Sequence, residues 1–236
     1  MQDPFPTTRW SLILQAQQPA GRKAEDALAV LCEAYWFPLY AYIRRRGVAP
    51  ADAADLVQGF FGQLLERRYV DAVRPGKGRF RAFLLHKMKH FLANEWEHAG
   101  AQKRGGGTAI LSLDVEDAEA RYGSALATQR TPETEYERRW ALQVVDRVVD
   151  RLAEDAARKN RSGEFQLLRG CLTDAAPALS YRELAVRIST TEAAIKSKIY
   201  RLRKRFGRLL REEVADTLQD LSDVDDEVRH LFHVLA

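Results

Sequence analysis

Residues 180–206 read SYRELAVRISTTEAAIKSKIYRLRKRF, and this stretch predicts two short helices with a sharp turn between them. Ser180 is placed to cap the first helix by accepting a hydrogen bond from a backbone N–H of its first turn. The first helix has one apolar face, formed by Tyr181, Leu184, Ala185 and Ile188. Thr191 is a good N-cap for the second helix, and Glu192 suits the positive end of that helix's dipole.

The second helix is predicted to have a buried side and a cationic side. Its apolar stripe repeats every three or four residues: Ile195, Ile199, Leu202, Phe206 and Leu209. The exposed candidates for binding are Thr191, Lys196, Ser197, Tyr200, Arg201, Arg203 and Lys204. Two helices joined by a tight turn, with the second one cationic, can place a recognition helix in the DNA major groove. The alternative is a helix whose arginines are simply solvated, but it has few acids for an ordinary salt-bridged surface.

The distribution of charge extends this prediction to the rest of the chain. The 236 residues carry a net charge of +4, with 46% hydrophobic and 30% charged residues, which is typical of a soluble globular protein. Residues 67–104 have a net charge of +7 and residues 180–211 of +8, whereas residues 114–137 have −5 and residues 212–236 have −7. Two basic blocks separated by an acidic spacer predict two modules that contact one polyanion.

The composition also bears on location and redox chemistry. The apolar runs are too short for a transmembrane helix, and the N-terminus lacks the basic and apolar regions of a secretory signal. Cys32 and Cys171 lie far apart in apolar surroundings, so we expect two buried small side chains rather than a disulfide or a metal pair. We therefore expect a cytoplasmic protein that does not contact membranes.

The N-terminal half predicts three more helices, over residues 25–46, 51–67 and 79–97. Pro38 is expected to break or kink the first of them. Asp52 follows Pro50 and is placed to cap or charge the first turn of the second.

The middle of the chain lacks a sustained helical pattern. Residues 101–114 are glycine-rich, and the acidic sequence from there to about Glu133 is interpreted as a linker. Two apolar helical faces follow, one at Trp140, Val144, Val145, Val148, Val149 and Leu152, the other at Phe165, Leu167, Leu168 and Leu172. The fold class is therefore all-α, with two helical domains joined by an acidic linker. The predicted parts are an N-terminal extension (1–28), a first module (29–105), the linker (106–135), a second module (136–214) and an acidic C-terminal tail (215–236).

Motifs in both modules resemble one family. SYRELAVRISTTEAAIKSKIYRLRKRFGRLL is similar to region four of bacterial sigma-70-type RNA polymerase sigma factors, especially the extracytoplasmic function (ECF) group. YWFPLYAYIRRRGVAPADAADLVQGFF and GKGRFRAFLLHKMKHFLANE resemble region two of the same family. The matches cover roughly residues 29–104 and 136–214, in the family's order.

The resemblance implies a division of labour. Region two would bind the clamp helices of the polymerase β′ subunit through Asp52, Asp55, Leu56 and Gln58. It would also melt the −10 promoter element with Lys87, Lys89, His90, Asn94, Trp96, Lys103 and Arg104. Region four would read the −35 element with the exposed residues of the second helix given above. Gly59 stands where the family usually has Glu, and Lys89-His90 stands where it commonly has a basic residue followed by Asn.

The family also implies partners, and the residues themselves argue against catalysis. The expected partners are core RNA polymerase (the β′ clamp helices and the β flap) and promoter DNA, with an anti-sigma factor or another regulator as a further candidate. The acidic linker would run through the nucleic-acid channels of the polymerase. We expect neither a catalytic residue nor a cofactor, because the sequence shows no nucleophile–base pair, phosphate-binding loop or metal set. His86 and His90 are spaced as a metal pair without a third ligand in view.

Three alternatives stay open at this point. The chain could be a helix-turn-helix regulator that acts without polymerase. Phe80, Phe83 and Phe91 could stack on unpaired bases, although core packing is favoured. The tail could pack on region four and shield its basic face, or it could be a plain capping helix, with an apolar stripe of Val224, Val228, Leu231, Phe232 and Leu235.

Overall fold

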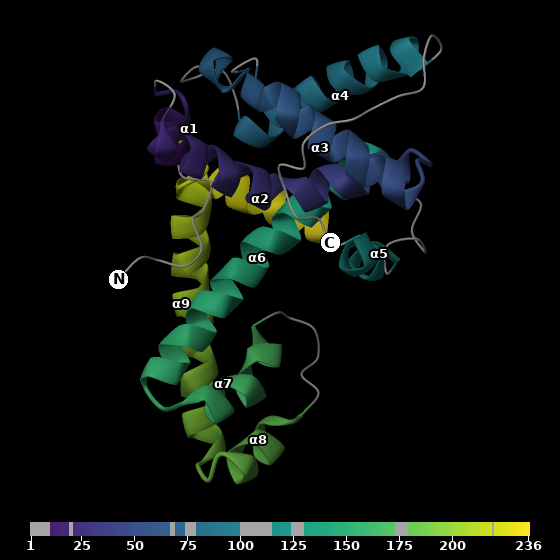
Figure 1. Cartoon of the computed structure of the whole chain (residues 1–236). Helices are drawn as coiled ribbons and strands as arrows, with labels where there is room; N and C mark the ends of the chain where they lie inside the picture. The colour runs from purple at the N-terminus through teal and green to yellow at the C-terminus, as the bar shows by residue number, and fades with distance from the viewer. Residues whose placement is uncertain are drawn as a thin grey trace. The chain divides into compact units, whose positions relative to one another are not determined.

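A computed structural model of the chain divides it into two compact units (Figure 1). Unit 1 comprises residues 1–141 and 215–236, and unit 2 comprises residues 142–214. The structure describes residues 10–18, 21–66, 69–73, 79–99, 115–123, 130–172, 179–218 and 220–236. Within these ranges every regular element is a helix, which confirms the predicted all-α class.

Among the described residues, unit 1 contains six whole α-helices, two 3-10 turns and the start of a seventh α-helix. Its elements are α1 (Trp10–Ala16), α2 (Arg22–Arg45), α3 (Pro50–Glu66), η1 (Tyr69–Ala72), α4 (Phe80–Ala99), α5 (Val115–Gly123), the start of α6 (Pro132–Arg158), η3 (Leu221–Asp223) and α10 (Val224–Leu235). The long helices α6 and α9 (Glu192–Ala215) pass from one unit into the other.

The core of unit 1 lies between α2, α3 and α4. The ring of Tyr35 meets that of Phe80 edge-on, with centroids 5.5 Å apart, and Phe60 meets Phe91 at 5.8 Å. Phe80 and Phe91 are buried and Phe83 is half-buried, so these aromatic side chains serve mainly as core. The apolar spacing in the sequence therefore indicated the correct inward faces.

Pro38 was predicted to break or kink α2, and the break is wrong, because Pro38 does not interrupt the helix. The helix runs without a gap from Arg22 to Arg45. A proline inside a helix removes one backbone hydrogen bond and crowds the preceding turn. Phe37, Leu39 and Tyr40 around it are all buried, and this packing holds the helix together across the defect.

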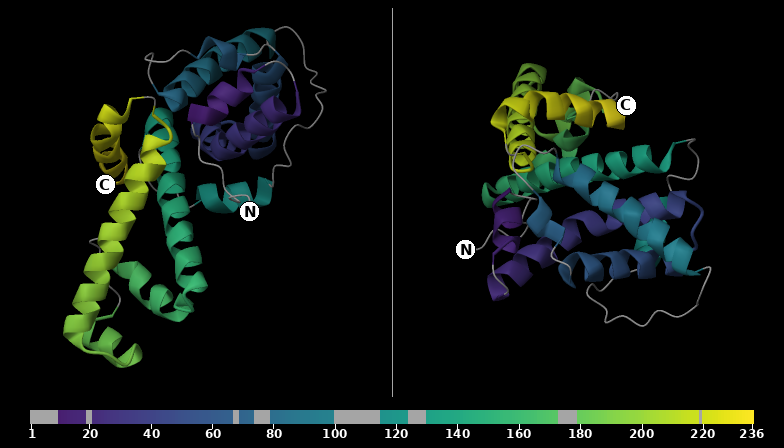
Figure 2. Two further views of the ribbon diagram at one scale, coloured as in Figure 1. Left: turned by 90° about the vertical axis from the view of Figure 1, so that its left-hand side faces the viewer. Right: turned by 90° about the horizontal axis from the view of Figure 1, so that it is seen from above.

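Unit 2 contains the rest of α6 and α9 together with α7 (Ser162–Leu168), η2 (Arg169–Cys171) and α8 (Tyr181–Arg187). Its core consists of Leu168, Cys171, Leu184, Ala185, Ile195 and Ile199. Figure 2 shows the same helices from two further directions. Arg147 and Arg151 of α6 form ion pairs with Glu213 of α9, at 3.6 and 3.4 Å.

The caps and the turn of the predicted helix–turn–helix are present. Ser180 and Glu183 form a reciprocal capping box at the start of α8. Between α8 and α9, Ser189 has a φ of 54°, and the Thr190 N–H bonds to the Ala185 carbonyl at 2.9 Å. This is the hydrogen bond of a Schellman ending, and it turns the chain sharply. The Oγ1 of Thr191 then accepts the Ala194 N–H at 3.2 Å and starts α9.

The segment interpreted as an acidic linker contains a helix that belongs to unit 1. Glu119 of α5 accepts two hydrogen bonds from the Arg44 guanidinium, at 2.7 and 3.0 Å, and one from the Tyr40 hydroxyl at 2.6 Å. Arg121 of α5 lies over the ring of Phe37, with its guanidinium carbon 3.9 Å from the centroid. Contacts with α2 thus stabilise α5, a helix too short to be stable in isolation.

The C-terminal tail also belongs to unit 1. In α10 the carboxylate of Glu227 is fully buried and forms ion pairs with Arg79, at 2.7 Å, and with Arg81. Arg81 also pairs with Glu137 at 2.7 Å. These contacts lie on α4 and the start of α6, which are both parts of unit 1.

Candidate nucleic-acid interface

The exposed face of α9 carries most of the residues predicted to read DNA. Ile195 and Ile199 bury one side of the helix in the core of unit 2, which leaves the opposite side to solvent. Lys196, Ser197, Tyr200, Arg201 and Lys204 are all exposed on it, and Tyr200 keeps 66% of its surface accessible. A large aromatic side chain so exposed contributes little to packing, and it is available for contact with a ligand.

Two of the predicted −35 residues have structural partners. The Nε of Arg203 donates to the Cys171 carbonyl at 2.8 Å and so ties α9 to η2. The hydroxyl of Thr191 is the cap of α9. Both residues are exposed as well, but these bonds give them a role in positioning α9.

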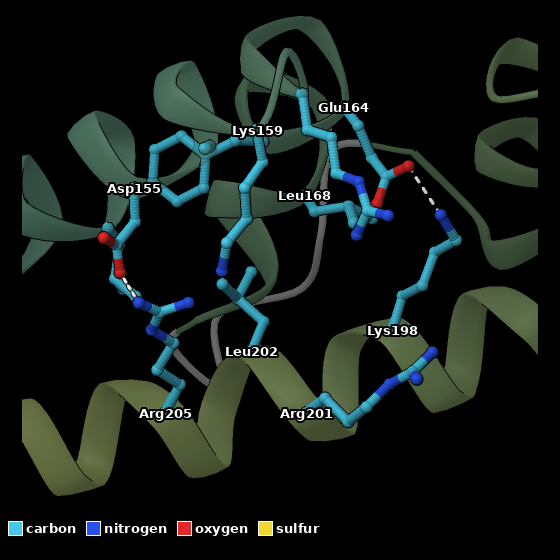
Figure 3. Close-up of a pocket in the computed structure, with 12 residues that line it drawn as sticks. Asp155, Lys159, Glu164, Leu168, Lys198, Arg201, Leu202 and Arg205 are labelled. Atoms are coloured by element: carbon cyan, nitrogen blue, oxygen red, sulfur yellow. Dashed lines mark hydrogen bonds and ion pairs between the residues drawn. The ribbon is translucent and has the colours of Figure 1, made fainter.

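A hollow of about 390 Å³ lies between α6, α7 and α9 within unit 2 (Figure 3). Its walls carry two ion pairs, Lys198 with Glu164 at 2.5 Å and Arg205 with Asp155. Phe165 and Leu168 give it an apolar floor. Because these charges pair between helices, they brace α9 and set the direction of its exposed face.

The predicted polymerase-docking residues lie on α3. Ala53, Ala54 and Val57 are buried against the unit, whereas Asp52 and Asp55 are exposed. Leu56 and Gln58 are half-exposed beside them. Asp55 and Leu56 follow Asp52 by three and four residues, which places both beside it on the helix surface. The structure therefore brings an acidic and apolar patch together on α3.

Two of the −10 candidates on α4 contact neighbouring side chains. Lys89 pairs with Glu133 of α6 at 2.7 Å. The Lys87 ammonium lies 4.6 Å from the centroid of the Tyr69 ring. His90, Asn94 and Trp96 are exposed. Lys103 and Arg104 lie outside the described residues.

Sequence reasoning missed two residues at this surface. The Arg46 guanidinium stacks on the Trp96 ring, 4.4 Å from its centroid. Glu133 accepts a hydrogen bond from Lys89, which lowers the pKa of Glu133 in spite of partial burial. The run Arg44-Arg45-Arg46 at the end of α2 was the signal in the sequence for Arg46, since a basic cluster can supply a cation for an exposed tryptophan ring.

The histidine pair of α4 and the two cysteines were the residues considered for metal or thiol chemistry. The rings of His86 and His90 lie 4.6 Å apart, and the described part of the chain contains no group of three potential ligands. Cys32 and Cys171 are buried and unpaired, and burial raises the pKa of Cys32 to about 12. None of the described helices combines the length and the apolar character needed to cross a membrane.

Comparison of the chain with protein-family models, with curated proteins and with solved structures found no significant match.

Proposed function

We propose that this protein is an alternative sigma factor of the ECF type, which binds core RNA polymerase and directs transcription from specific promoters. The observation that carries the proposal is the capped helix–turn–helix of unit 2, with Lys196, Tyr200 and Arg201 exposed along one face of α9. The acidic patch on α3 of unit 1 gives the second contact that a sigma factor needs. The sequence motifs described above support both assignments.

In this function α9 lies in the major groove of the −35 element. Lysine and arginine can pair with the O6 and N7 atoms of guanine, and Tyr200 can contact a thymine methyl group or a phosphate. The bond from Arg203 to the Cys171 carbonyl and the ion pairs of α9 with α6 and α7 hold the helix rigid. A rigid reading helix loses little conformational entropy when it binds.

Unit 1 holds the polymerase and the −10 element. Asp52 and Asp55 on α3 face solvent, where they can pair with basic residues of the β′ clamp helices. On α4, Trp96 offers an aromatic surface for an unstacked base, and Lys89 offers a cation for its phosphate.

Reconstitution with core RNA polymerase tests the proposal. The full chain is mixed with core enzyme, and transcripts from a library of promoter fragments are mapped by run-off transcription. We expect a stable complex and start sites that share a −35 and a −10 element. The absence of both core binding and any specific transcript would refute the proposal. Tight, specific duplex binding by the chain without core would instead favour a helix-turn-helix regulator.

A further inference from the structure

The cationic face of α9 does not end with the helix–turn–helix. Beyond Tyr200 a shallow hollow of about 820 Å³ lies on the second half of the helix, within unit 2. Six of its eight lining residues are lysine or arginine and one is an acid, Glu212. Arg203 and Arg205 also bond to η2 and α6, whereas Lys204, Arg208 and Arg211 are exposed on the side of α9 away from the core.

The hollow continues the same stripe that carries the −35 candidates. Ser197, Tyr200, Lys204, Arg208 and Arg211 follow one another at spacings of three and four, which keeps them on one side of a helix. The helix has 24 residues and is therefore about 36 Å long. The major groove is only about 12 Å wide, so bases can meet one part of such a helix and the rest passes the phosphodiester backbone.

Gly207 lies in the middle of this face. An added Cβ at this position would meet only the Nη1 of Arg211, at 3.7 Å, so packing does not require glycine here. Glycine is among the least favourable residues inside a helix. Because Gly207 has no side chain, the helix surface is depressed between Lys204, Arg208 and Arg211, and a ligand can approach the backbone closely there.

The cations around Gly207 can exchange their present partners for phosphate. Arg208 pairs with Glu212 at 2.8 Å, but the two side chains are 62% and 43% exposed, and such surface pairs are weak. The Nη1 of Arg211 reaches the Gly207 carbonyl at 3.4 Å, a long hydrogen bond. Lys204 is exposed.

We propose that the second half of α9 is a phosphodiester-binding site for duplex DNA, centred on Gly207 and formed with Lys204, Arg208 and Arg211. It binds the backbone without regard to sequence and fixes how deeply the first half of α9 enters the groove. The inference rests on the proposed function, since it takes α9 as a helix that reads a duplex. It adds a second site, with a chemistry different from base recognition.

Salt dependence of DNA binding tests this site in the full chain. Fluorescence anisotropy measures the affinity for a 30-base-pair promoter duplex and for a scrambled duplex between about 50 and 200 mM salt. The slope of log K against log salt is negative. Arg208→Gln and Arg211→Gln should each make it shallower by about 0.9, equally on both duplexes. Arg158→Gln is the matched control, because it removes an exposed arginine of unit 2 that lines neither of the two hollows described above. It should leave the slope unchanged.

Gly207→Leu separates a binding role from a structural one. Leucine favours a helix more than glycine does, so helicity and the melting temperature should not fall, whereas binding to both duplexes should weaken. Unchanged affinity in Gly207→Leu and in both arginine variants would overturn the site. Loss confined to the promoter duplex would overturn the phosphate assignment in favour of base contact, and an equal loss in Arg158→Gln would point to net charge alone.

The outcome is distinguishable from failure of the proposed function. If the wild-type chain binds both duplexes and the variants lose this binding, the site stands even where core polymerase gives no specific transcript. If transcription is promoter-specific but the variants bind DNA as the wild type does, the site fails and the sigma-factor proposal stands. A single-stranded RNA of equal length is included as a third probe, and preference for it over both duplexes would overturn the duplex assignment.

Discussion

At the scale of single residues, Arg81 of α4 is a buried charge that contacts α6 and α10 within unit 1. Its side chain is only 4% exposed, pairs with Glu137 and Glu227, and lies 4.1 Å from the centre of the Trp140 ring. Burial alone would lower the pKa of Arg81, but the attraction of the two carboxylates raises it. The guanidinium therefore stays charged and holds α4, α6 and α10 together.

Arg81→Ala should lower the free energy of unfolding by about 3 kcal/mol, because Glu227 would stay buried with Arg79 as its remaining cation. Urea unfolding followed by circular dichroism measures the change. The double variant Arg81→Met with Glu227→Leu should recover much of the loss, since it removes both buried charges. Arg229→Ala is the control, because Arg229 is 78% exposed on α10. A loss below about 1 kcal/mol in Arg81→Ala would contradict the buried cluster.

At the scale of elements, α5 depends on Glu119. Hydrogen bonding from Arg44 lowers the pKa of Glu119 below its usual 4.5, despite an opposing effect of burial, and the hydrogen bond from Tyr40 acts in the same direction. A lowered carboxyl pKa contributes stability above about pH 4.5, and this contribution is lost as the pH falls through the lowered value. We therefore expect α5 to loosen from α2 at acidic pH.

Hydrogen exchange of the α5 amides measures this attachment. In the wild type, protection of residues 115–123 should be constant above about pH 5, after correction for the intrinsic exchange rate, and should fall at lower pH. Glu119→Gln should have low protection above and below about pH 5, because a neutral amide cannot form the two charged hydrogen bonds with Arg44. Glu116→Gln is the control, since Glu116 is exposed on the same helix. Equal protection in wild type and Glu119→Gln at neutral pH would contradict this role.

The acidic start of α6 competes for a cation of the proposed −10 surface. Glu133 pairs with Lys89, and both side chains are nearly half exposed, so this is a weak surface pair. If Lys89 contacts the displaced strand, Glu133→Gln should raise the affinity for a single-stranded −10 oligonucleotide, by less than about fivefold. Anisotropy with the full chain measures it, with Glu97→Gln, an exposed acid on α4, as control. A lower affinity in Glu133→Gln would contradict the competition.

These elements also show what the sequence could and could not predict. The helix–turn–helix was predictable because its caps and apolar spacing are local: Ser180 meets Glu183, and Thr191 meets Ala194. The helices α5 and α10 depend on partners 75 and 146 residues away, namely Glu119 with Arg44 and Glu227 with Arg81. Pairing at such separation leaves no periodic signal, so the sequence indicated an acidic linker and a tail where the structure has docked helices.

At the scale of the whole molecule, two units carry different predicted contacts on one chain. The exposed carboxylates of α3 belong to unit 1, and the exposed cations of α9 before Val214 belong to unit 2. Each surface can therefore be changed without altering the packing of the other unit. This separation makes the bipartite function testable by variants that affect only one contact.

Asp55→Arg should abolish binding to core polymerase, since it reverses the charge of the α3 patch, and should leave the unfolding free energy nearly unchanged because Asp55 is exposed. Lys196→Ala and Tyr200→Ala should weaken recognition of the −35 element by about 1–3 kcal/mol wherever a base contact is lost. They should leave core affinity intact. Core affinity is measured by anisotropy with labelled chain, and promoter recognition by run-off transcription at saturating chain. Loss of both activities in all three variants would contradict the modular assignment, because exposed residues of separate units would then be acting on one common property of the fold.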